Sequence, residues 1–273
     1  MSPYHGFGNN PISKVDANGA NEDNYLISDD GSIEVQRTND KTDNFKFKKS
    51  DGTVVDFGTF EKNENGLIPL PSSLKVDGVG FQYKGSKNEN YISGSAFAAL
   101  IGVLEYSRVS DLSLNHWSNA DGSSPAPSKS HKNGTVGDLK PLRLDKSGGK
   151  VLVSDEQFDK TRNAKLIEGV FLYGWTSVLS EKYDGYITPK TTHFTNPRHN
   201  NHFHIQRFKP KLKEVDHLDI PSSINTTQPP ILDVNLFEQK RDIIPNQRNE
   251  RIIERKYKSK KELNEIVDDY GKA

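Results

Sequence analysis

The sequence predicts an α+β fold, and three observations support this prediction. Short runs of alternating apolar and polar residues, separated by Asp-Gly pairs, occupy the first part of the chain and indicate β-hairpins. An apolar stripe with helical spacing begins near residue 93, and a second one follows residue 154. Further alternating runs lie between and after these two stripes, so the chain combines strands with helices.

Composition sets the first limits on structure and function. The chain has 273 residues, enough for one or two domains, but only 32% are hydrophobic and the mean hydropathy is −0.77. Part of the chain is therefore expected to be linker or solvated tail. The 37 basic and 37 acidic residues cancel at a pI near 7.1, which predicts no nucleic-acid or membrane partner. No cysteine is present, so His, Asp or Glu would have to hold any metal.

A β-rich segment is expected over residues 20–80. Two hairpins are predicted around Asp-Gly turns, with strands at 25–28 and 32–36 and at 44–48 and 53–57. Together they predict a β-meander that serves as scaffold, stalk or recognition module. The stretch Leu67–Pro71 indicates a linker, which places a domain boundary near residue 80.

A second unit is expected over residues 81–210. A helix from Ser93 carries an apolar stripe on one face, formed by Phe97, Leu100, Ile101 and Leu104. A strand at Val109–Trp117 and a long loop at 118–130 follow, and Ser154–Gln157 predicts a capping box for a second helix that ends near Gly174. A strand from Trp175 comes next. Residues 211–273 are expected to be a polar extension with a short terminal helix.

The stretch from Arg198 to Gln206 contains three histidines and is the candidate centre of the chemistry. His202 and His204 stand two apart in an alternating run, so both rings should leave one face of a strand roughly 7 Å apart. One ring can bind a metal while the other faces what the metal binds. A lone His-x-His pair is more often an ordinary surface or core feature, so its partners decide the question.

Two partner residues precede this stretch by about sixty positions. His131 and Asp138 are separated by Gly134 and Gly137, which permit a turn that directs both side chains toward one point. Two nitrogen ligands and one carboxylate, with a fourth position open to water, match the stoichiometry of a catalytic zinc site. Taken alone, either residue would fit an ordinary polar loop.

These motifs resemble those of the LAS metallopeptidases, the group that contains lysostaphin, D-alanyl-D-alanine peptidases and the hedgehog domain. The pattern is most similar to that of penicillin-insensitive murein endopeptidases. Their S-H-x-x-G-x-x-x-D motif matches Ser130, His131, Gly134 and Asp138, and their H-x-x-H-x-H motif matches His199, His202 and His204. The resemblance covers about residues 90 to 209.

The resemblance implies a small antiparallel sheet with flanking helices. It also implies Zn²⁺ held by His131, Asp138 and His204, with His202 as the catalytic histidine and His199 as a further active-site histidine. The carboxypeptidase branch of the group has a Glu as base three residues before the last ligand. Asn201 stands there in this sequence, which favours the endopeptidase branch. His193, in the preceding loop, is expected to have no role.

Residues 1–19 resemble the segment that closes the core of Rhs (YD-repeat) proteins, just before their variable C-terminal toxins. The match to S-P-Y-x-Y-x-x-N-N-P-x-x-x-x-D-P-x-G runs from Ser2 to Gly19 and departs at Ala17, where the family has Pro. It implies an effector that is secreted or injected as part of a larger polypeptide and acts at the cell wall or periplasm of a target cell. An immunity protein and a secretion or injection carrier would be its protein partners.

The sequence therefore predicts a zinc-dependent peptidase that hydrolyses amide bonds in the peptides of bacterial peptidoglycan. Two alternatives come from other functional classes. Rhs C-termini are often nucleases, so a metal-dependent nuclease toxin is one alternative, although the neutral pI opposes it. A non-catalytic zinc-binding module, as in the hedgehog branch, is the other.

Overall fold

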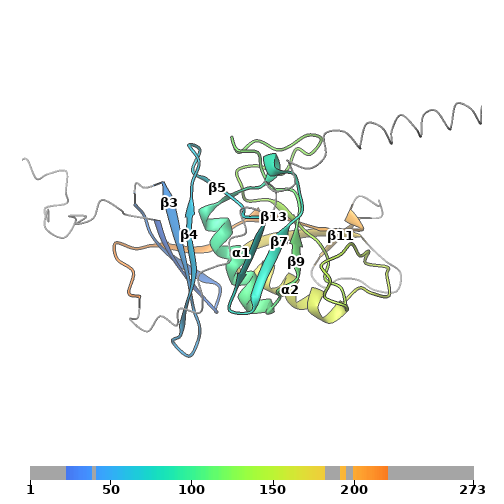
Figure 1. The fold of residues 1–273 in the computed structure, drawn as a ribbon, viewed down its shortest axis with the longest axis horizontal. Helices are drawn as coiled ribbons and strands as arrows, with labels where there is room; N and C mark the ends of the chain where they lie inside the picture. Colours follow the sequence, from blue (N-terminus) through green and yellow to red (C-terminus); the bar gives the residue numbers. More distant parts are fainter. Residues whose placement is uncertain (1–22, 39–40, 182–190, 195–198, 221–273) are drawn as a thin grey trace, which may run out of the picture. The chain divides into compact units, whose positions relative to one another are not determined.

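The structure is a computed structural model that describes residues 23–38, 41–181, 191–194 and 199–220. The Rhs-like segment 1–19, the side chain of His193 and the expected C-terminal helix lie outside the described residues. Contacts divide the chain into two units, residues 1–232 and 233–273, and only the first unit contains described residues. In this part of the chain the fold is α+β, as predicted (Figure 1).

The first sheet contains both hairpins that the Asp-Gly turns predict. Its strands, in spatial order, are β14 (Lys211–Glu214), β2 (Ser32–Gln36), β1 (Asp23–Ser28), β3 (Thr42–Lys48) and β4 (Val54–Glu61). Strand β1 pairs antiparallel with β2, and β3 with β4, which confirms the hairpins. The sheet is not a meander, because β3 pairs in parallel with β1 and not with β2. Strand β2 provides the return segment that a parallel pair requires.

The second sheet is mixed and carries the candidate site. Its order is β12 (Thr192–Phe194), β11 (Trp175–Glu181), β13 (Phe203–Phe208), β10 (Gly137–Leu139), β9 (Leu112–Leu114), β7 (Val79–Tyr83) and β6 (Ser73–Val76). The central strands β9, β10, β13 and β11 pair antiparallel. Parallel pairs join β7 to β9 and β12 to β11. The sheet is thus only partly antiparallel.

The expected linker at Leu67–Pro71 contains a strand. Strand β5 (Leu67–Pro69) pairs with β8 (Tyr91–Ser93) in a two-stranded sheet. Leu67 and Ile68 are buried. Their burial favours a strand over a solvated linker, and a proline is tolerated here because β5 has only one neighbour in its sheet.

Helix α1 (Gly94–Ser107) begins where the sequence predicts. The Ser93 hydroxyl caps it by accepting a hydrogen bond from the backbone N–H of Ala96. The helix lies between β1 and β3 of the first sheet and β7 of the second, and it is buried around most of its circumference (Figure 1). Phe97 fills the space on the side of the first sheet, where its ring meets Phe45 and Phe60 edge-on with centroids 4.9 and 4.8 Å apart.

Helix α2 (Lys160–Leu172) begins later than the sequence predicts. Its N-cap is Asp159, whose carboxylate accepts a hydrogen bond from the Arg162 backbone N–H. The expected capping box at Ser154–Gln157 does not form, because the Asp155 carboxylate accepts the backbone N–H of Leu152 and the chain turns there. No helix within the described ranges is both long and apolar enough to span a membrane.

A single hydrophobic cluster extends from Tyr25 in β1 to Ile205 in β13. It therefore includes residues on both sides of the boundary expected near residue 80. Strand β14 also pairs with the first sheet, although residues from 211 onward are expected to be a polar extension. The domain limits themselves stay a prediction, which a fragment of the chain can test.

Candidate metal centre

Strand pairing places two of the candidate metal ligands together. Asp138 in β10 and His204 in β13 are direct partners in the antiparallel ladder, so their side chains leave the same face about 5 Å apart at Cβ. Their neighbours Leu139 and Phe203 alternate to the opposite face and are fully buried in the core. The apolar positions of these strands thus anchor the register that aligns Asp138 with His204.

A tight turn brings His131 to the same point. Gly134 has a φ of 63°, and a Cβ there would lie 2.3 Å from the backbone nitrogen of Ser93. This position therefore requires glycine, as the sequence predicts for the turn. Gly137 acts differently: a Cβ on it would lie 2.4 Å from the Trp117 ring, so its role is close packing.

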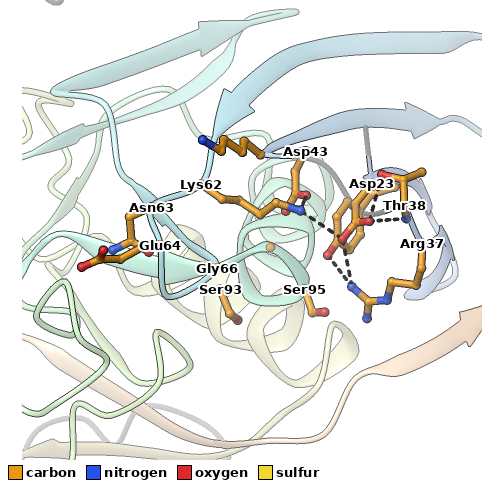
Figure 2. Close-up of a pocket in the computed structure, with 13 residues that line it drawn as sticks. Asp23, Arg37, Thr38, Asp43, Lys62, Asn63, Glu64, Gly66, Ser93 and Ser95 are labelled. Carbon is orange, nitrogen blue, oxygen red and sulfur yellow. Dashed lines mark hydrogen bonds and ion pairs between the residues drawn. The ribbon is translucent and has the colours of Figure 1, made fainter. Parts of the chain in front are cut away.

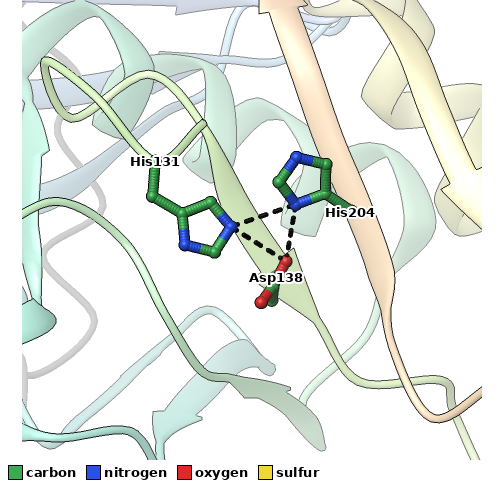
Figure 3. A group of neighbouring side chains, drawn as sticks. All are labelled: His131, Asp138 and His204. Atoms are coloured by element: carbon green, nitrogen blue, oxygen red, sulfur yellow. Dashed lines mark hydrogen bonds and ion pairs between the residues drawn. The ribbon is translucent and has the colours of Figure 1, made fainter. Parts of the chain in front are cut away.

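The three side chains converge through one atom each, as Figure 3 shows. His131 Nε2 lies 3.0 Å from His204 Nδ1 and 3.3 Å from Asp138 Oδ1, and His204 Nδ1 lies 2.9 Å from the same carboxylate oxygen. All three residues are at most 5% exposed. Two ring nitrogens and one carboxylate oxygen thus form a buried triangle with sides near 3 Å.

This triangle fits a metal ion. Ligands bound tetrahedrally at 2.0–2.2 Å are about 3.3 Å apart, close to the separations of these atoms. Calcium and magnesium prefer sites built from oxygen alone, whereas a set of two imidazoles and one carboxylate suits a first-row transition metal. These three residues could therefore hold a metal ion.

The far nitrogens of the two histidine ligands have different surroundings. His204 Nε2 lies 3.3 Å from the Ser130 hydroxyl, which can accept the Nε2 proton when a metal ion takes the place of the proton on Nδ1. His131 Nδ1 is buried without a hydrogen-bond partner among the described residues. Its ring is instead sandwiched between His116, at a centroid distance of 6.3 Å, and His204, at 4.8 Å.

Electrostatics favour an ionised carboxylate at the centre of the cluster. Burial opposes ionisation of Asp138, but hydrogen bonds from His131 and His204 outweigh it and hold the pKa of this carboxyl well below its usual range. Burial lowers the pKa of His202, although the Asp138 charge opposes that shift. A neutral His202 beside a charged Asp138 is the consequence at neutral pH.

His202 and His199 complete the group of predicted site residues. His202 Nε2 lies 3.8 Å from Asp138 Oδ1, and its Nδ1 lies 2.8 Å from Asn201 Oδ1, which can accept the Nδ1 proton. The His199 ring lies 5.0 Å from His202 and 5.8 Å from His204 between centroids. The structure therefore gathers all five predicted residues into one cluster, while their individual roles stay predictions.

The pair His116 and Glu89, beside the cluster, is not predicted from the sequence. His116 follows β9, its ring stacks on His131, and its Nδ1 hydrogen-bonds the Glu89 carboxylate from a short 3₁₀ helix, Lys87–Glu89. The only sequence signal is that His116 stands near the end of the alternating run 109–117, shortly before the loop that leads to His131. That run predicts a strand, and nothing in it identifies the strand's neighbours.

Comparison with known proteins adds no family to these observations. No protein-family model matches the chain, and no curated protein matches it. Functional inference therefore depends on the geometry of the cluster and on the motif resemblance.

Proposed function

We propose that this protein is a zinc-dependent peptidase that hydrolyses amide bonds in bacterial peptidoglycan. One observation carries the proposal: His131 Nε2, Asp138 Oδ1 and His204 Nδ1 converge in a buried triangle with sides of 2.9 to 3.3 Å. The resemblance to murein endopeptidases at the same residues supports the substrate class.

The donor set supports zinc among the transition metals. Two histidines and one carboxylate, with a fourth position left for water or substrate, are typical of catalytic zinc sites. When bound, zinc supplies Lewis acidity, which polarises a carbonyl group and makes water more acidic. The residues that would hold it are His131, Asp138 and His204.

His202 is the group placed to move protons in this proposal. Asn201 accepts the proton on Nδ1, so the neutral ring presents the lone pair of Nε2 on the side of Asp138. In hydrolysis His202 takes one proton from the attacking water as the C–O bond forms. It then delivers that proton to the leaving nitrogen as the C–N bond breaks.

The setting of this activity comes from the N-terminal resemblance. A segment that resembles the end of an Rhs core supports an antibacterial effector carried on a larger polypeptide and directed at the cell wall or periplasm of a target cell. An immunity protein and a secretion or injection carrier are the partners that such an effector requires.

Digestion of isolated sacculi tests the proposal. We expect the full chain to release soluble peptides with new amino termini, to lose this activity with a chelator, and to regain it with zinc. Mass spectrometry of the fragments would identify the cleaved bond. A His217→Ala variant, altered at an exposed histidine, serves as the control and should retain full activity.

Parallel incubations separate the alternatives. Cleavage of plasmid DNA without release of peptides from sacculi would contradict the peptidase and support the nuclease. Stoichiometric zinc with neither activity would instead support a non-catalytic zinc module.

A further inference from the structure

A cavity of about 670 Å³ lies between the first sheet and the start of α1 (Figure 2). Its walls come from β1, the segment after β2, β3, the turn between β4 and β5, and residues 93–95. None of the histidines of the candidate metal centre lines it. Its volume is in the range of about 300–1,000 Å³ that is typical of small-molecule sites.

The floor of the cavity is acidic. Asp23 and Asp43 are 7% and 1% exposed, and one ammonium group serves both: Lys62 Nζ lies 2.7 Å from Asp43 Oδ1 and 3.3 Å from Asp23 Oδ2. These two carboxylates thus share the half-buried Lys62 ammonium, and Asp23 Oδ2 also lies 3.5 Å from Arg37 Nη1. Burial raises the pKa of Asp43 to about 6, although the Lys62 ammonium opposes that shift.

The Asp43 carboxylate lies very close to the backbone at the start of α1. A Cβ on Gly94 would lie 2.2 Å from Asp43 Oδ2 and 2.5 Å from the Tyr25 hydroxyl, so only glycine allows this carboxylate to reach the start of α1. A purely structural packing would be served by apolar side chains at lower desolvation cost. The glycine at position 94 therefore makes room for the Asp43 carboxylate at the floor of the cavity.

Two cations stand at the mouth of the cavity. Arg37 and Lys41 line it and are exposed. The Arg37 guanidinium donates to the Tyr25 hydroxyl at 3.0 Å and to the Glu214 carboxylate at 3.0 Å, and its Nη1 lies 3.5 Å from Asp23 Oδ2. In Figure 2, Glu64 lies on the opposite side of the view from Arg37.

We propose that this cavity is a second binding site, for an amino acid or the end of a short peptide that carries both an ammonium and a carboxylate group. The ammonium faces Asp23 and Asp43, and the carboxylate faces Arg37 and Lys41. Each charge of the ligand thus meets the opposite charge of the wall.

The walls of the cavity also contact the loop that carries His131. Asn63 Nδ2 donates to the carbonyl of Ala120 at 2.7 Å, and the Ser93 backbone N–H donates to the carbonyl of Gly134 at 3.0 Å. A peptide held in the cavity therefore rests on segments that support the metal centre. The proposal does not depend on peptidase activity, because binding is measured without turnover.

Calorimetric titration of the full chain with three matched probes tests the ligand class. Glycylglycine carries both charges, N-acetylglycylglycine lacks the ammonium and glycylglycinamide lacks the carboxylate. We expect glycylglycine to bind, and each blocked probe to bind at least about tenfold more weakly, since each loses one charged contact. Absence of glycylglycine binding, or equal affinity for a blocked probe, would overturn the assignment.

Variants locate the site. Asp43→Asn should weaken glycylglycine at least about tenfold. Lys41→Gln, at an exposed position, should weaken glycylglycine but leave glycylglycinamide unchanged, and it carries the test if the Asp43 variant fails to fold. Lys75→Gln, at an exposed lysine of β6, is the matched control. His204→Ala should bind glycylglycine like the parent; loss of binding in this variant would place the dipeptide at the histidine cluster and overturn the proposal.

Discussion

The two buried charged clusters of this molecule are neutralised in different ways. In the first sheet, Asp23 and Asp43 share Lys62, an ammonium that is charged at neutral pH. In the second sheet, the groups that contact Asp138 Oδ1 within 4 Å are imidazoles of His131, His202 and His204, which are charged only when protonated. The first cluster contains its own cation, whereas the second obtains one from protons or from a metal ion.

The clusters also differ in how the chain assembles them. Asp23 and Asp43 lie on neighbouring strands whose residues are exact register partners. The second cluster joins β10 to β13 across more than sixty residues and adds His131 from a turn. A cluster built from distant segments and lacking a cation of its own is the one that a metal ion would stabilise most.

Removal of the central carboxylate should have the largest effect. We expect Asp138→Ala to lose nearly all bound zinc and nearly all hydrolysis of sacculi, because a carboxylate that bridges two histidines is replaced by a methyl group. Elemental analysis and digestion assays measure both losses. Asp216→Ala, at an exposed aspartate, is the control, and a full equivalent of zinc in Asp138→Ala would disprove the ligand assignment.

His202 and His204 should separate chemistry from metal binding. His202→Ala is expected to keep its zinc and its fold but to lose about 10²–10⁴-fold in rate, the usual contribution of a positioned general acid–base group. His204→Ala should lose the zinc itself. If His202→Ala retained zinc and activity within about threefold of the parent, well under that contribution, His202 would only orient a ligand and His199 would become the candidate base.

The packing of α1 against the first sheet should contribute strongly to stability. Phe97 is fully buried between rings of the first sheet, so Phe97→Ala is expected to cost about 3–5 kcal/mol in the free energy of unfolding, measured with denaturant. A fragment of residues 81–212 would expose the same face of α1, and we expect it to be poorly soluble. A folded, soluble fragment would support the domain boundary that the sequence places near residue 80.

The smallest expected effect is a pH dependence that is specific to the first cluster. The pKa of Asp43 is about 6 in the folded protein against 3.8 for the ordinary group, so folding favours its protonated form. Its contribution to stability is therefore complete below pH 3.8 and is lost as the pH rises through about 6. Asp43→Asn should remove this loss, and unfolding measured at pH 4 and pH 7 would show it as a smaller decline than in the parent. An identical decline in Asp43→Asn and the parent would contradict the assigned shift; Asp51→Asn, at an exposed aspartate, is the control.

Local features of the fold were accessible from the sequence because they depend on neighbouring residues. The Asp-Gly hairpins, the Ser93 cap and the apolar face of α1 follow from turn geometry and periodicity within about ten residues. The start of α2 was predicted too early, because Ser154–Gln157 and Asp159 both offer caps and the contact of Asp155 with Leu152 decided between them. The motifs likewise indicated His131, Asp138 and His204 as a set.

By itself, the sequence determined which residues can bind a metal, since residue type and spacing define donor chemistry and the face of a strand. Only the tertiary structure decided that β1 lies beside β3, that His116 stacks on His131 and that Asp43 reaches the start of α1 beside a cavity. Each of these contacts joins segments that are separated along the chain. Periodicity records which way a side chain points but carries no information about which distant segment it meets.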